Sequence, residues 1–219
     1  MFGDDDTAHK WSNHFYRMDE VLLEDISIVW PSLVRDLPSD STETRINSNL
    51  VQRLRKHKKT KNHYQAIHSI HAPFPATNKD AKGLIVERGL IDFAIVLIED
   101  YEQYLACECK RLNVLYGKKL DSLAGKYIED GVMRFVSGKY SDEQPIGCML
   151  GYVMDGNIVS AKKSIWTAIE GAWRAATALD GEPVMMAKIN GIKRFSTTHF
   201  RRKDEKFEIR HALLSFKKR

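Results

Sequence analysis

Two apolar runs that follow one another closely, residues 90–97 and 104–112, constrain the fold more than any other part of the chain. Each run has the length and composition of a buried β-strand, and the short polar link between them predicts a hairpin. Each run also carries charge, with Asp92 in the first and Glu108 and Lys110 in the second. Charged groups inside buried strands are costly unless something pairs them. The hairpin therefore has to bring these three side chains into a position where their charges are compensated.

The expected register of this hairpin brings the two acids together. Side chains alternate along a strand, so Glu108 and Lys110 lie on one face. With the turn centred near Asp100, the numbers of paired residues sum to about 200, which places Asp92 opposite Glu108 or within one position of it. Opposed residues have Cβ atoms about 4.5–5.5 Å apart. Two carboxylates at that distance repel unless a cation lies between them, and a divalent ion with oxygen ligands supplies the charge.

Two acids, a divalent ion and a lysine match the needs of metal-assisted phosphodiester cleavage. The ion, Mg²⁺ or alternatively Mn²⁺, polarises a phosphate oxygen and activates a water. The amine of Lys110 reaches the same position, where it can orient that water or offset charge in the transition state. Other interpretations stay open: Glu108 and Lys110 as solvated charges on an exposed strand edge, and Asp92 as a strand-start residue bonded to the backbone.

The remaining pattern predicts a mixed α/β layer protein. In chain order we expect a polar arm over 1–20, a short strand or turn over 21–34, a helix over 42–56, a strand within 62–72, a loop over 73–82 and the hairpin strands over 84–97 and 104–112. There follow a helix over 119–136 with Leu120, Leu123, Tyr127 and Ile128 toward the core, a buried strand over 146–154, a helix over 157–179, and a last hairpin of strands over 194–201 and 207–216. The continuous apolar run of 146–154 is typical of a strand that is covered on both faces.

The helix over 42–56 adds a further acid. Asp40 and Ser41 are candidate N-caps, and apolar residues four apart define one helix face, with Glu43 on the same side one turn earlier. Glu43 can equally belong to a capping box with Asp40, and that alternative stays open. The helix ends in a basic cluster, where cations suit the helix dipole.

The acid Asp92, the triplet Glu108-Cys109-Lys110 and the order of the flanking elements resemble the PD-(D/E)XK nuclease superfamily, which has the restriction-endonuclease-like fold. The resemblance covers about residues 40–155, and Ile91 stands where the motif often has a proline before the acid. It implies a mixed central sheet flanked by helices, with a C-terminal helix and β-hairpin extension. It also implies that Asp92 and Glu108 bind the metal, that Lys110 assists the attacking water and that Glu43 completes the site.

The domain organisation that follows is a lead-in over 1–39, a nuclease-like core over 40–155, and a C-terminal helix and hairpin over 156–219 packed on that core. The expected function is a metal-dependent endonuclease acting on DNA, with RNA left open, in restriction or antiviral defence. We expect a cutting subunit beside a separate ATPase or sensor protein, because the chain is small and has no recognisable specificity domain. The chain also has no phosphate-loop motif and therefore no ATP-driven motor of its own. A homodimer is expected because cutting both strands usually needs two such sites. The alternative is a catalytically silent nucleic-acid-binding or assembly subunit with the same fold.

Several basic residues are candidate contacts to nucleic acid. The net charge is +5 and the pI about 9.0, a balance that permits a polyanionic partner without requiring one. The candidates are Arg53, Arg55, Lys56, Lys58 and Lys59 in the basic cluster, Lys126 on the helix after the triplet, and His199 and Arg201 on one face of a C-terminal strand. The basic cluster can instead be a charged helix end, and His199 and Arg201 can belong to a solvent-facing hairpin.

The three cysteines and the hydropathy predict a cytoplasmic protein. Cys107, Cys109 and Cys148 lack a second metal-ligand pair at zinc spacing, so we expect buried, reduced thiols. The first ten residues are polar and acidic, which does not fit a signal peptide. No apolar run approaches the roughly 20 residues that a membrane span needs, so no membrane contact is expected.

Overall fold

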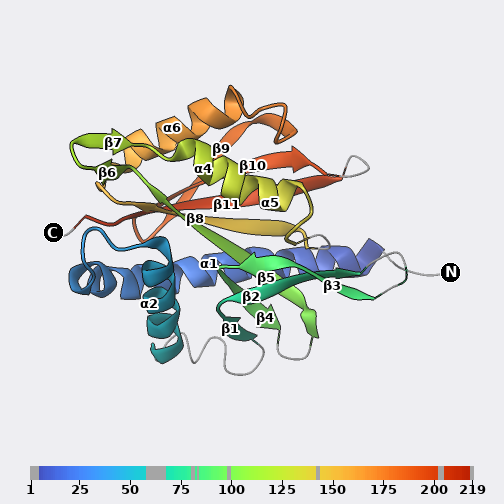
Figure 1. Cartoon of the computed structure of the whole chain (residues 1–219). Helices are drawn as coiled ribbons and strands as arrows, with labels where there is room; N and C mark the ends of the chain where they lie inside the picture. Colours follow the sequence, from blue (N-terminus) through green and yellow to red (C-terminus); the bar gives the residue numbers. More distant parts are fainter. Residues whose placement is uncertain are drawn as a thin grey trace.

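The computed structural model describes residues 5–57, 68–79, 82, 84–97, 100–141, 144–201 and 205–217. Its centre is a mixed seven-stranded sheet (Figure 1). In spatial order its strands are β1 (His68–His71), β4 (Phe93–Leu97), β5 (Asp100–Leu112), β8 (Ile146–Val153), β11 (Lys206–Ser215), β10 (Ile192–Phe200) and β9 (Leu179–Ile189). β8 runs parallel to both β5 and β11, and the other neighbouring strands are antiparallel.

Helices cover both faces of this sheet, as predicted for a mixed α/β layer protein. α1 (Asp5–Asp36) and α2 (Glu43–Lys56) lie on one face, and α4 (Ala124–Tyr127), the π-helical turn η1 (Ile128–Val132), α5 (Met133–Val136) and α6 (Ile158–Glu170) lie on the other (Figure 1). The alternation of side chains divides the core: Cys107 and Cys109 pack toward α1 and α2, and Ala106 packs toward α4 and α6. β8 is buried along its whole length, as its continuous apolar run indicates.

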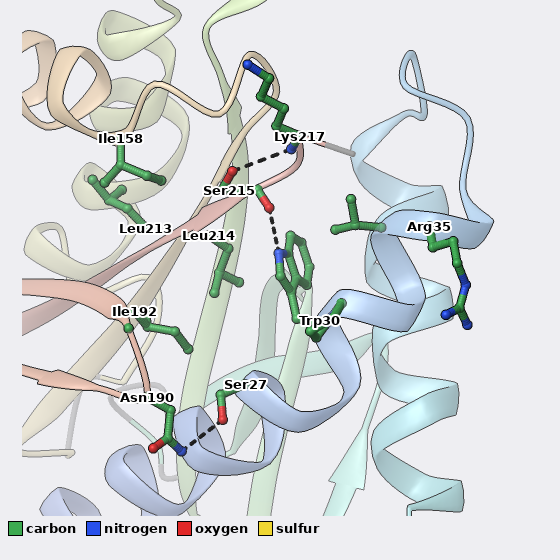
Figure 2. A pocket seen from close by; sticks show the side chains of 13 residues that line it. Ser27, Trp30, Arg35, Ile158, Asn190, Ile192, Leu213, Leu214, Ser215 and Lys217 are labelled. Carbon is green, nitrogen blue, oxygen red and sulfur yellow. Dashed lines mark hydrogen bonds between the residues drawn. The ribbon is translucent and has the colours of Figure 1, made fainter. Parts of the chain in front are cut away.

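The N-terminal region differs most from the expectation. From Asp5 onward, the expected arm over 1–20 and the expected strand or turn over 21–34 are one long helix, α1, and Pro31 lies inside it. Its buried apolar residues recur every three or four positions, as in Leu22, Ile26 and Trp30, so the helix is held by packing against the sheet. Trp30 also donates from Nε1 to the carbonyl oxygen of Ser215 at 2.7 Å, which ties α1 to the end of β11 (Figure 2).

Three other local predictions are wrong. The loop over 73–82 contains β2 (Phe74–Lys79), which pairs with β3 (Ile85–Ile91) in a separate two-stranded sheet. The start of the helix over 119–136 is instead β7 (Lys119–Asp121), paired with β6 (Val114–Tyr116), and Leu120 is 49 % exposed, whereas Tyr127 and Ile128 are buried as predicted. The helix over 157–179 ends at Glu170, and the unpredicted β9 follows it.

The C-terminal hairpin is confirmed as an antiparallel pair of strands, β10 and β11. It lies within the central sheet, because β11 pairs directly with β8. The three cysteines are free thiols and are buried, in line with the expectation. Among the residues that the structure describes, no helix combines the length and the apolar content that crossing a membrane requires.

Candidate active site

Asp92 lies where the chain passes from the small β2–β3 sheet into the central sheet. The expected single strand over 84–97 is divided here, because β3 ends at Ile91 and β4 begins at Phe93. Phe93 pairs with Cys107, and these residue numbers sum to 200 as predicted. The expected turn centre near Asp100 is wrong, because Asp100 begins β5 and pairs with Leu97. One step beyond the Phe93–Cys107 pair, Asp92 comes opposite Glu108. The predicted meeting of these two acids is therefore confirmed.

Beyond the end of β4, two carboxylates accept the backbone hydrogen bonds that a neighbouring strand would otherwise accept. β4 pairs with β5 only as far as Cys107, so the next backbone N–H groups on that edge of β5 need other acceptors. Asp92 Oδ2 accepts from the backbone N–H of Cys109 at 2.7 Å, and Glu43 Oε2 accepts from that of Arg111 at 3.0 Å. Asp92 is therefore bonded to the backbone, as the alternative interpretation expected, but only through one of its two carboxylate oxygens. These two bonds fix both acids beside β5.

Glu43 belongs to α2, an element far from the β4–β5 hairpin in the sequence. Thr42, and neither Asp40 nor Ser41, is the N-cap of α2, and its hydroxyl accepts from the backbone N–H of Arg45 at 3.3 Å. Glu43 is the first residue of the helix, which points its side chain at β5. The structure therefore brings Glu43 into the cluster as predicted, and the capping-box alternative is not what the contacts show.

Lys110 sits between the acids. Its Nζ donates to Glu108 Oε1 at 2.7 Å, to Glu43 Oε1 at 3.1 Å and to the carbonyl oxygen of Cys109 at 2.9 Å, which uses all three ammonium protons. Burial lowers the pKa of Lys110, but Glu108, Glu43 and Asp92 together raise it further, so the net shift is upward. Lys110 is therefore a fixed positive charge at this site.

Glu108 is the most buried member, with 1 % of its surface exposed. Its Oε1 accepts from Lys110 and, at 3.0 Å, from Nη1 of Arg134, whereas its Oε2 is buried without a hydrogen-bond partner among the described residues. Burial and the neighbouring Asp92 raise the pKa of Glu108 to about 7. Burial likewise raises the pKa of Asp92. The strand-edge interpretation, in which Glu108 is solvated, is wrong.

These features test whether a divalent ion fits. A buried carboxylate oxygen without a hydrogen-bond partner, next to a second acid, is free to coordinate a cation. In the described part of the chain, no three His, Cys, Asp or Glu side chains are grouped closely enough to form a complete protein cage. The donor set of Asp92 and Glu108 fits Mg²⁺, which commonly takes one or two carboxylates and keeps water as its other ligands.

Arg134 and its partner Tyr140 are site residues that the sequence did not reveal. Arg134, on α5, also donates from Nη1 to the hydroxyl of Tyr140 at 2.7 Å, and that hydroxyl donates to the carbonyl oxygen of Leu90. Lys126, the predicted nucleic-acid contact on this helical segment, is exposed on α4, and no contact joins it to the cluster among the described residues. The sequence predicted a helix in this region, but it did not show which helix residue faces the sheet. That depends on the π-helical turn η1, which hydrophobic periodicity does not reveal.

A glycine allows this helix to approach the cluster. Gly131 lies in η1, and a Cβ at this position would come 2.5 Å from the Met149 side chain and 3.7 Å from Cγ of Lys110. A larger residue would push η1 away from β5 or displace Met149. π-Helical turns of this kind occur frequently at functional sites. Gly131 thus contributes to the placement of Arg134, which follows it on the same helix.

The basic cluster at the end of α2 divides into anchored and exposed residues. Arg53 bonds Asp36 at 2.7 Å and Ser32 at 2.9 Å, so it ties α2 to α1. Arg55 donates from Nε and Nη2 to the carbonyl oxygen of Ile70. Lys56 is exposed. The predicted contacts Lys58 and Lys59 lie outside the described residues.

His199 and Arg201 do not fit the predicted contact with nucleic acid, because both are buried. His199 is 0 % exposed, and its ring nitrogens bond the carbonyl oxygen of Thr177 and the hydroxyl of Thr197. Arg201 donates to the carbonyl oxygen of Ser141 at 2.6 Å and its guanidinium lies 3.2 Å over the Phe207 ring. The solvent-facing alternative is also wrong. The alternation placed the two residues on one face, and that face is packed against the helices.

The cluster joins two acids for a cation, a third acid from α2, and two positive side chains that hold Glu108 at one oxygen. Such an arrangement can bind a divalent ion and an anionic group next to it. Comparisons with known proteins found no matching family model, no matching curated protein and no matching solved structure.

Proposed function

We propose that this protein is a metal-dependent nuclease that hydrolyses phosphodiester bonds of DNA at the Asp92–Glu108–Lys110 cluster. The observation that carries the proposal is the unpartnered, buried Oε2 of Glu108 beside Asp92, with Lys110 on the other oxygen. A purely structural ion pair has no reason to leave a buried carboxylate oxygen without a partner.

Each residue has a distinct part in the proposed reaction. Asp92 and Glu108 would hold Mg²⁺, which when bound polarises a phosphate oxygen and lowers the pKa of water. Lys110, kept protonated by the surrounding acids, attracts the phosphate and offsets negative charge in the transition state. Because Lys110 stays protonated and its three protons bond protein acceptors, it acts through its positive charge and does not remove a proton from the attacking water. Glu43 holds Lys110 in place, and Arg134 fixes the orientation of the Glu108 carboxylate.

The order of elements around the cluster supports the proposal. α2 precedes the sheet, β4 and β5 carry the acid and the triplet, α4 to α5 follow, and β8 then pairs parallel to β5. This is the order on which the resemblance to the PD-(D/E)XK nuclease superfamily rests. A setting in restriction or antiviral defence, a separate ATPase or sensor subunit and a homodimer remain parts of the same proposal.

The test is cleavage of plasmid and of labelled oligonucleotides in Mg²⁺, in Mn²⁺ and in EDTA. Lys110→Ala and Glu108→Gln should each lower the cleavage rate by about 10²–10³ or more, the range seen when one stabilising group for transition-state charge is removed. Glu129→Gln is the matched control, because Glu129 is an exposed acid on the neighbouring turn η1. Equal activity of wild type and Lys110→Ala would refute the assignment.

A catalytically silent subunit is the second candidate, and one observation favours it. The three hydrogen bonds of Lys110 all go to protein acceptors, so the cluster can also serve to hold α2 on β5. Wild-type protein that shifts DNA in a gel but does not cut in either metal would support this function.

A further inference from the structure

The acid cluster opens at Asp92 into a groove of about 780 Å³ that follows α2. One wall is the exposed side of that helix, and the other includes Pro73 and Leu90. The helix wall is formed by side chains four residues apart, which lie on one side of a helix: Thr44, Ser48, Gln52 and Lys56. Because α2 begins with Glu43, the groove starts at the cluster and ends at the basic end of the helix.

The chemistry of the groove changes along its length. Asp92 is the only acid among the described residues that line it, and it stands at the end where a divalent ion would offset its charge. Hydroxyl and amide side chains follow, which can donate to or accept from base edges and sugars. Arg55 and Lys56 lie at the far end, and Arg55 is held there by its two bonds to the carbonyl oxygen of Ile70. This sequence of groups suits a polyanion that enters over the cations and ends at the cluster.

The size of the groove selects the form of that polyanion. Its volume lies in the range of sites for small ligands, about 300–1,000 Å³, and is too small for a duplex. From Glu43 to Lys56 the helix rises about 20 Å. That length matches about six phosphates at the stacked spacing of about 3.4 Å along one strand, and fewer in an extended strand.

We infer that this groove binds a single strand of nucleic acid and leads its scissile phosphate to Asp92. The inference rests on the proposed function and deepens it, since it names a single-stranded end or a strand separated from its complement as the substrate. In this arrangement Lys56 contacts a backbone phosphate several nucleotides from the cleavage point, and Ser48 and Gln52 contact the nucleotides between.

The test is binding of fluorescein-labelled oligothymidylates of increasing length and of a matched duplex, measured by anisotropy in EDTA and again in Ca²⁺. Lys56→Ala should weaken single-strand binding about fourfold at 0.15 M salt and reduce the slope of log K against log salt by about 0.7, the effect of losing one phosphate contact. Arg45→Ala is the matched control, because Arg45 is an exposed cation on α2 that does not line the groove. It should leave both quantities unchanged.

The outcomes separate this inference from the proposed nuclease activity. Single-strand binding that depends on Lys56 and not on Arg45 supports the groove, even if wild type cuts nothing, in which case the nuclease proposal fails alone. Cleavage without a preference for single strands, equal effects of Lys56→Ala and Arg45→Ala, tighter binding of the duplex, or no binding of any strand would each overturn the groove inference.

Discussion

Two buried carboxylates, Glu108 on β5 and Asp19 on α1, lie on opposite faces of the central sheet, and each is held by two cations. At Asp19, Arg194 and Arg210 both bind Oδ2, and Cys148 donates to Oδ1, so both oxygens are used. At Glu108, Lys110 and Arg134 both bind Oε1, and Oε2 is left without a partner among the described residues.

The charge balance also differs between the two clusters. Around Asp19, Glu208 is the second acid, and the two arginines balance the pair. Around Glu108, Asp92 and Glu43 are further acids, so three carboxylates face two cations. A surplus acid and an unpartnered oxygen are what separate a site with room for a cation from an ion pair that only holds two elements together. The comparison therefore favours a structural role for the Asp19 cluster and supports the proposal that the Glu108 cluster binds a cation.

The largest expected effect is on stability at the Asp19 cluster. Asp19→Asn leaves two arginines without their buried acid and should lower the free energy of unfolding by about 3–5 kcal/mol. Urea unfolding measures the change, and the cleavage rate per folded molecule should stay at the wild-type level. If Asp19→Asn instead abolished cleavage in a protein of normal stability, the division between the two clusters would be wrong.

The next effect is the pH dependence of stability that comes from Glu108. Burial and Asp92 raise its pKa from 4.5 to about 7, so the folded protein binds this proton more tightly than the unfolded chain does. The resulting stability is complete below pH 4.5 and is lost as the pH rises through 7, a change of about 3 kcal/mol. Unfolding of wild type and Glu108→Gln at pH 5 and pH 8, without divalent metal, measures it. The variant should lack this component of the pH dependence, and identical profiles would contradict the shift.

The smallest effect concerns binding of the metal. A divalent ion has to displace the proton from Glu108, so the affinity for Mn²⁺ should fall about tenfold for each pH unit below about 7 and level off above it. Calorimetric titration at several pH values measures the trend, with Asp19→Asn as a control that keeps it. An affinity that stays constant from pH 5 to pH 8 would exclude a Glu108 ligand whose pKa is raised as described.

The hairpin part of the site could be predicted from the sequence because strands have a fixed period. The pairs from Phe93–Cys107 to Val96–Tyr104 keep the predicted sum of 200, which brings Asp92 to Glu108. Nearer the turn, Leu97 pairs with Asp100, and the register shift between Val96 and Leu97 that restores this sum could not be read from the sequence. The same reasoning placed Lys110 on the face of Glu108. The triplet is a local property of the sequence, so no knowledge of the rest of the fold was needed to find it.

The other site residues depend on packing between distant segments. Arg134 reaches Glu108 only because η1 shifts the register of its helix and Gly131 allows a close approach. α1 was missed because Pro31 and the interspersed acids hide its apolar period. His199 was placed on the correct strand, but the helices that bury that face could not be located from the strand alone.

The position of the Asp92 carboxylate at the bend between β3 and β4 depends on how the neighbouring apolar residues pack in the core. The residues on either side, Ile91 and Phe93, are both 0 % exposed and pack on opposite faces of the structure. Inserting one residue next to Asp92 would have to turn an apolar side chain toward the acids or carry the carboxylate into the apolar interior. The acid is therefore protected from slippage by the same hydrophobic packing that stabilises the protein, and loss of its position would be accompanied by loss of the fold around it.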